Sequence, residues 1–80
     1  MPREIRLYSR SGCHLCEQAV EHLEHIAALV ALHVTEINIL DDPKLYERYK
    51  HSIPVIEIAD GPTLNAPIDE QELRQALGAA

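Results

Sequence analysis

Residues 9–16, with the sequence SRSGCHLC, contain both cysteines of this 80-residue chain and separate two kinds of sequence pattern. The residues before them alternate between apolar and polar, which is typical of a β-strand, and the residues after them carry apolar side chains at helical spacing. Two cysteines placed at random in a chain of this length would stand three apart in roughly one case in forty. The spacing of Cys13 and Cys16 therefore indicates a functional pair at the junction of a strand and a helix.

The position of the pair indicates reactive thiols. The first turn of a helix presents free backbone N–H groups and the positive end of the helix dipole, and both stabilise a thiolate. At helical spacing Cys16 lies inside the apolar face, near Leu23 and Ala27, whereas Cys13 lies at the edge of that face. We therefore predict that Cys13 is the exposed nucleophile and that Cys16 is the buried resolving thiol.

Two neighbouring side chains are candidates to tune the pKa of Cys13. Arg10 is cationic and stands three residues before it, and His14 follows it directly. The helix dipole is worth roughly 0.3 to 1 kcal/mol at an exposed site, whereas one pKa unit corresponds to about 1.4 kcal/mol. The dipole alone therefore lowers the pKa of Cys13 by less than one unit. A larger shift requires Arg10 or hydrogen bonds from amides or from the Cys16 thiol.

The whole chain predicts the order βαβαββα. Strands are expected at residues 4–8, 33–39, 53–58 and 63–65, and helices at residues 13–30, 42–51 and 69–77. In the first strand Ile5 and Leu7 share one face, and Tyr8 lies on the opposite, polar face. The succession of strand, long helix and strand predicts a parallel pair of strands with a right-handed crossover. The long helix should bury one face, formed by Leu15, Ala19, Leu23, Ile26, Ala27 and Val30.

Capping residues mark the predicted helix starts. Ser11 or Gly12 is expected to cap the first helix, an aspartate of the pair at residues 41–42 the second, and Asp69 the third. Pro43 fits the first turn of the second helix, where its missing N–H costs nothing.

Composition limits the classes of function. Eighty residues make a single domain, residues 1–80, with 46% hydrophobic and 25% charged residues and a net charge of −6. The seven basic residues are scattered, so we expect no nucleic-acid binding. No apolar run approaches the roughly 18 residues of a membrane span, and residues 1–5 lack the apolar region of a secretory signal. We therefore expect a cytoplasmic protein, in which paired cysteines serve redox chemistry or metal binding.

Zinc binding by the cysteines is a weaker interpretation. Four residues of the types that bind zinc occur close together in the sequence: Cys13, Cys16, His22 and His25. On a rigid helix, however, both histidines point about 120° to 180° away from Cys13, so the four side chains cannot meet. We therefore predict no metal site. The cysteines could also be inert core residues, although their position at a strand–helix junction argues against this.

The chain resembles small glutaredoxin-like proteins, which have the thioredoxin-like fold, along nearly its whole length. The resemblance rests on residues 7–10, LYSR, leading into the cysteine pair, and on residues 52–56, SIPVI, which match a strand that begins with a cis-proline. It implies that Pro54 is cis and lies against the cysteines, and that Ile53 offers its backbone to an incoming disulfide-bonded chain. It also implies a mixed four-stranded sheet with helices on both faces.

The chain departs from the family pattern at two places. His14 and Leu15 stand between the cysteines where dithiol glutaredoxins usually have proline and tyrosine. Residues 65–69, NAPID, replace the Gly-Gly pair whose backbone helps to hold glutathione, and Asp69 alone matches the acidic position that follows. The resemblance therefore implies that Asp69, like Ile53 and Pro54, takes part in substrate binding. Because Pro67 lacks an N–H, the usual glutathione pose loses a backbone donor here.

These observations predict a thiol–disulfide oxidoreductase in which Cys13 attacks a substrate disulfide and Cys16 resolves the mixed disulfide. The substrate is expected to be a disulfide-containing protein or a low-molecular-weight thiol, with glutathione, a flavoenzyme or a dedicated protein as reductant. We expect a monomer without a bound cofactor. Two alternatives stay open: a module that holds a metal or an iron–sulfur cluster through the cysteines of two subunits, and an adaptor without turnover.

Overall fold

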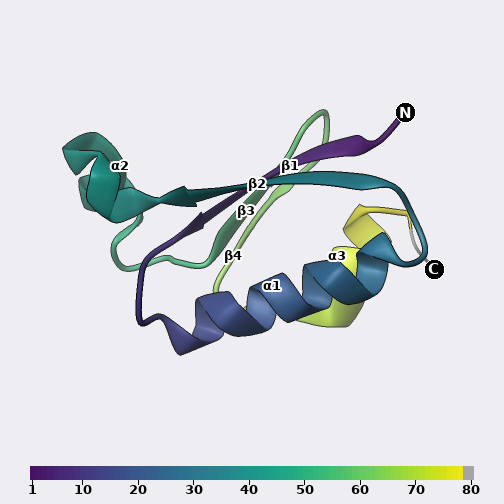
Figure 1. Cartoon of the computed structure of the whole chain (residues 1–80), viewed down its shortest axis with the longest axis horizontal. Coiled ribbons are helices and arrows are strands. Elements are labelled where there is room, and N and C mark those ends of the chain that lie inside the picture. Colours follow the sequence, from purple (N-terminus) through teal and green to yellow (C-terminus); the bar gives the residue numbers. More distant parts are fainter. Residues whose placement is uncertain (79–80) are drawn as a thin grey trace.

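Strand β1, Arg3–Ser9, is an inner strand of a four-stranded sheet (Figure 1). The strands lie in the order β2-β1-β3-β4, where β2 spans Leu32–Asn38, β3 Val55–Ile58 and β4 Thr63–Asn65. β1 pairs with β2 in parallel and with β3 antiparallel, and β3 forms an antiparallel hairpin with β4. The structure is a computed structural model and describes residues 1–78. It confirms the βαβαββα order that the sequence predicts and the mixed sheet that the family resemblance implies.

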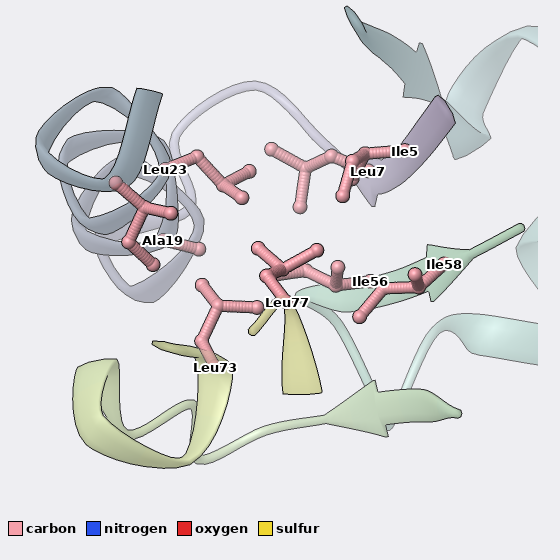
Figure 2. Close-up of a cluster of buried hydrophobic side chains, with 9 residues drawn as sticks. Ile5, Leu7, Ala19, Leu23, Ile56, Ile58, Leu73 and Leu77 are labelled. Atoms are coloured by element: carbon pink, nitrogen blue, oxygen red, sulfur yellow. The ribbon is translucent and has the colours of Figure 1, made fainter. Parts of the chain in front are cut away.

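Two helices, α1 (His14–Ala27) and α3 (Glu70–Ala76), cover one face of this sheet (Figure 1). Figure 2 shows side chains of α1 and α3 meeting the apolar side chains of β1 and β3. The helical repeat of α1 brings apolar residues to this face every third or fourth position, and the pleat of each strand brings every second residue to it. The buried core consists of Ile5, Leu7, Ala19, Leu23, Ile26, Ile56, Ile58, Leu73 and Leu77.

Helix α2, Pro43–Tyr49, covers one end of the opposite face and follows a short 3₁₀ turn at Ile39–Asp41. Tyr8 packs there against Val55, and the centroids of the Tyr8 and Tyr49 rings are 4.6 Å apart. Tyr8 lies on the predicted face but is buried, because α2 lies over this end of the strand. The expectation of helices on both faces is therefore confirmed.

The predicted capping residues hold the starts of α2 and α3. The Asp42 carboxylate accepts a hydrogen bond of 2.9 Å from the Lys44 N–H, and Pro43 occupies the first helical position. The Asp69 carboxylate accepts one of 3.0 Å from the Gln71 N–H. Each carboxylate satisfies an N–H that has no partner within the helix, so local sequence was enough to place both starts.

The helix ends differ from the prediction. α1 ends at Ala27 and α2 at Tyr49, before the predicted ends at residues 30 and 51. After Ala27 the N–H groups of Leu29 and Val30 both donate to the Ile26 carbonyl, at 2.8 and 3.0 Å, which closes the helix in a tight turn. Side-chain periodicity carries no information on this change in backbone bonding. Within residues 1–78 no helix is long and apolar enough to cross a membrane.

Replacing Leu73 by alanine should destabilise the fold strongly. The Leu73 side chain is fully buried where α3 meets the core, and a buried Leu→Ala substitution costs about 2–5 kcal/mol. A chain of this size has a free energy of unfolding of roughly 4–12 kcal/mol. Urea unfolding followed by circular dichroism measures the loss. Leu29→Ala, at a side chain that is 59% exposed, is the matched control and should change the free energy by less than about 0.5 kcal/mol. Equal losses would contradict this packing of α3.

Candidate functional site

The loop between β1 and α1 brings the first cysteine to the start of the helix. Gly12 has a φ of 78°, in the left-handed region that residues with a Cβ rarely adopt, and Cys13 then returns to extended backbone. Cys13 is the N-cap of α1, and its Sγ accepts a hydrogen bond of 3.1 Å from the Cys16 N–H. The predicted caps, Ser11 and Gly12, are therefore wrong, because the sulfur itself takes the place of a capping oxygen.

The two cysteines form a disulfide, and their Cα atoms lie 5.2 Å apart. The structure thus holds the oxidised pair, in which the Cys13 sulfur stands where the thiolate of the reduced protein would be. Cys16 is 2% exposed and Cys13 is partly exposed. The predicted difference in burial between the two sulfurs is confirmed. Their roles as nucleophile and resolving thiol stay predictions.

Both cysteines line a shallow cavity of about 450 Å³ at the start of α1. Arg10 lines the same cavity and is the cationic side chain among its lining residues. The acidic lining residues are Glu17, Glu21 and Glu24 from α1 and Glu36 from β2. The charge around the cysteines is therefore mainly negative. The net charge of the chain is also negative, but it does not show where the acidic side chains gather.

The structure separates the two residues predicted to tune Cys13. Arg10 shares the cavity with Cys13 and is exposed. The His14 side chain is 80% exposed and turns along the helix, with ring nitrogens 3.3 Å from Gln18 Nε2 and 3.8 Å from the Glu17 carboxylate. Arg10 is therefore better placed than His14 to act on the Cys13 sulfur.

Leu15, between the cysteines, does not belong to the buried face of α1. Its side chain is 50% exposed, and Ala27 at the other end of the helix is also exposed. The sheet lies against the side of the helix that carries Cys16 and Ala19, so residues at the edge of the predicted apolar face remain in solvent. Leu15 thereby presents an apolar surface beside the disulfide.

The segment before β3 lies at the same end of the sheet as the cysteine loop. The peptide bond between Ile53 and Pro54 is cis, as the family resemblance implies, and Pro54 is buried. Val55 pairs with Tyr8 in the antiparallel register, so Pro54, the residue before Val55, lies level with the end of β1. At this point the chain leaves β1 and turns toward α1 (Figure 1). The Ile53 N–H donates to the Tyr49 carbonyl at 3.1 Å. The Ile53 N–H is therefore already bonded within the chain, and the part of Ile53 in substrate binding stays a prediction.

Asp69 has a local structural task. Its carboxylate caps α3, and it is not among the residues that line the cavity of the cysteines. Asp69 stands directly before Glu70, the first residue of α3. A second cis peptide bond, between Ala66 and Pro67, comes shortly before it in the chain. Its predicted part in substrate binding stays a prediction.

His22 and His25 turn away from the cysteines, as the helix geometry predicts, and meet a residue that the sequence did not connect with them. Their Nδ1 atoms lie 2.9 and 3.0 Å from Oε1 of Glu70, the first residue of α3. Hydrogen bonds from His25 and His22 lower the pKa of Glu70 to about 2. The spacing of three residues shows that the histidines share a helix face, but Glu70 stands 45 residues further along the chain.

The chain matches the family model described as Glutaredoxin-like domain (DUF836) over residues 4–78. Among solved structures it is similar to the X-ray structure of target protein XcR50 from X. campestris, with 39% sequence identity and a TM-score of 0.79 over 95% of this chain and 97% of that one. It is also similar to the solution structure of protein Ne2328 from Nitrosomonas europaea, with 27% identity and a TM-score of 0.77 over 99% and 91%. The search of curated proteins gave no match.

The two thiols of the reduced protein should differ in their rate of alkylation. Cys13 is partly exposed and bonded by an amide, whereas Cys16 is buried, so limiting iodoacetamide should modify Cys13 at least about tenfold faster. Peptide mass spectrometry at short reaction times measures the two rates. In urea-unfolded protein, the control, the rates should become similar. Faster modification of Cys16 in the folded protein would contradict the assignment of the exposed sulfur.

Proposed function

The chain belongs to the glutaredoxin-like family, and from the arrangement of its cysteine pair we propose that it is a thiol–disulfide oxidoreductase. The disulfide between Cys13 and Cys16 at the start of a helix fits a role in thiol redox chemistry. The observation that carries the proposal is the hydrogen bond from the Cys16 N–H to the Cys13 sulfur. In the reduced protein this amide favours the thiolate over the neutral thiol.

The proposed reaction runs in two exchange steps. The Cys13 thiolate attacks one sulfur of a substrate disulfide, the substrate S–S bond breaks, and the leaving thiolate takes up a proton. The Cys16 thiol then loses its proton and attacks the Cys13 sulfur, which breaks the mixed disulfide and releases the second substrate thiol. Two electrons pass to the substrate, and the protein is left with the disulfide described above.

The burial of Cys16 suits it to the second step. An apolar environment disfavours a thiolate, so Cys16 stays protonated while Cys13 reacts. Once a mixed disulfide has formed on Cys13, Cys16 is the thiol next to it, and the exchange becomes intramolecular. We propose that Ile53 contacts the incoming substrate through its carbonyl and that Pro54 lies against the substrate disulfide.

The charge around the cavity bears on the choice of substrate and reductant. Four glutamates and one arginine line it, so an anionic disulfide approaches against a net repulsion. Glutathione carries two carboxylates and one amine, and its disulfide carries the charge twice. We propose that glutathione serves as reductant only weakly and that neutral or cationic disulfides, including disulfides flanked by basic residues in a polypeptide, react faster. We also propose that the protein acts as a monomer in the cytoplasm, where the reducing environment favours reduction of the substrate disulfide.

Replacing the cysteines one at a time should separate their roles. Cys13→Ser should abolish reduction of a small disulfide or of insulin, because a serine hydroxyl cannot form a mixed disulfide with the substrate. Cys16→Ser should still form the mixed disulfide but fail to resolve it, so that the adduct accumulates and is seen by mass spectrometry. Undiminished turnover by Cys13→Ser, or an adduct on Cys16 in that variant, would reverse the assignment.

The acidic lining should discriminate among small disulfides by charge. Reduced protein should react faster with cystamine, a dication, than with glutathione disulfide, when each rate is divided by that of a neutral small thiol with the same disulfide. The preference should fall as salt rises above about 0.1 M, and in Glu17→Gln and Glu21→Gln variants. Glu72→Gln makes the same charge change outside the cavity and should leave the preference unchanged. This selectivity would be contradicted if the ratio of the cystamine rate to the glutathione disulfide rate changed neither with salt nor in the variants of the cavity glutamates.

A further inference from the structure

Two histidines and one carboxylate meet where α1 packs against α3. His22 and His25 are three residues apart on α1, so their side chains point within about 60° of each other. Nδ1 of His22 and Nδ1 of His25 lie 2.9 and 3.0 Å from the same oxygen, Oε1 of Glu70. One ligand atom from each residue lies within 4.8 Å of the others.

The two histidine–glutamate distances are close to the spacing of ligands around zinc. Zinc bonds to imidazole nitrogen and carboxylate oxygen are about 2.0–2.2 Å long, which sets two ligands of a tetrahedral ion about 3.3 Å apart. The two nitrogen–oxygen distances fall a few tenths of an ångström short of this and have the length of hydrogen bonds. A cation that takes the place of these hydrogen bonds would draw the two nitrogens, now within 4.8 Å of each other, to this spacing, and water can complete its coordination.

The second oxygen of Glu70 is already held. Arg74, one turn later on α3, donates from Nε to Glu70 Oε2 at 3.2 Å, which leaves Oε1 to face the histidines. Carboxylates that bind metals commonly have a hydrogen bond of this kind, because it fixes the orientation of the ligand.

The packing of the two helices holds the ligands in register. Leu73 lies one turn after Glu70, and it packs in the same buried cluster as Leu23 and Ile26, which stand beside the two histidines in the sequence of α1. Contacts between apolar side chains therefore set the approach of α3 to α1 without help from the polar cluster. A preformed set of ligands binds a metal without the cost of ordering the chain.

We propose that His22, His25 and Glu70 form a binding site for a divalent transition-metal cation of the zinc type, separate from the cysteine pair. The donor set of two imidazoles and one carboxylate suits zinc better than magnesium or calcium, which prefer oxygen ligands. His22 stands six residues after Cys16, about 9 Å along the helix axis and about 120° around it. A metal here would clamp α3 to α1 and stabilise the fold.

The oxidised protein is the correct form for the test. In the reduced protein the two thiolates would bind zinc themselves and hide a weaker site. The disulfide removes both thiolates, and the histidines and Glu70 lie on another side of α1 and remain in place. Isothermal titration of the oxidised protein with zinc chloride should therefore give one site per chain.

Matched variants locate that site. His25→Gln and Glu70→Gln should each weaken zinc binding at least tenfold, and the rise in Tm that zinc gives the unmodified protein should disappear in both. His33→Gln is the control, because His33 forms the same kind of contact with Glu4, at 2.7 Å, as an exposed pair on β1 and β2. It should leave the affinity unchanged.

A second measurement needs no variant. Nickel or cobalt added to the oxidised protein should broaden the NMR signals of the His22 and His25 rings and leave those of His33 and His51 sharp. The proposal is overturned if oxidised protein binds no zinc at one site per chain, if folded His25→Gln and Glu70→Gln bind as the unmodified protein does, if His33→Gln weakens binding equally, or if all the rings broaden alike.

Discussion

The packing of α1 on β1 is the contact on which the rest of the structure depends. Ala19, Leu23 and Ile26 of the helix bury Ile5 and Leu7 of the strand, and this apolar contact fixes both the direction of α1 and its rotation about its own axis. The rotation turns one sulfur into the core and leaves the other at the surface. The difference between two chemically identical side chains thus follows from how a helix lies on a strand.

Two kinds of interaction surround the Cys13 sulfur: a hydrogen bond from the Cys16 N–H and the more distant negative charge of the glutamates that line the cavity. A hydrogen bond to a charged group contributes about 1.5–3 kcal/mol, more than the roughly 0.3–1 kcal/mol of a helix dipole at an exposed site, so the Cys16 N–H supports a thiolate on Cys13 more strongly than the dipole does. The four glutamates of the cavity act through solvent, where salt screens them. Contact therefore governs the state of the sulfur, whereas the surrounding charge acts mainly on what approaches it.

Helix α1 serves two different purposes along its length. Its first turn holds the disulfide, and its second half carries the two histidines that meet Glu70 of α3. The histidines point away from the cysteines, and the side of the helix that carries Cys16 and Ala19 packs on the sheet. A single helix of 14 residues is thus involved in the redox pair, the core and the polar contact with α3.

Local sequence patterns were enough to predict the order of the elements, the parallel pairing of β1 with β2, the starts of α2 and α3 and the burial of Cys16. These depend on periodicity and on side chains that bond within a few residues, as Asp42 and Asp69 do. Contacts between elements account for the burial of Tyr8, the exposure of Leu15 and the meeting of His22 and His25 with Glu70. Each of these depends on which element lies against which, and contacts between residues far apart in the chain leave no local pattern in the sequence.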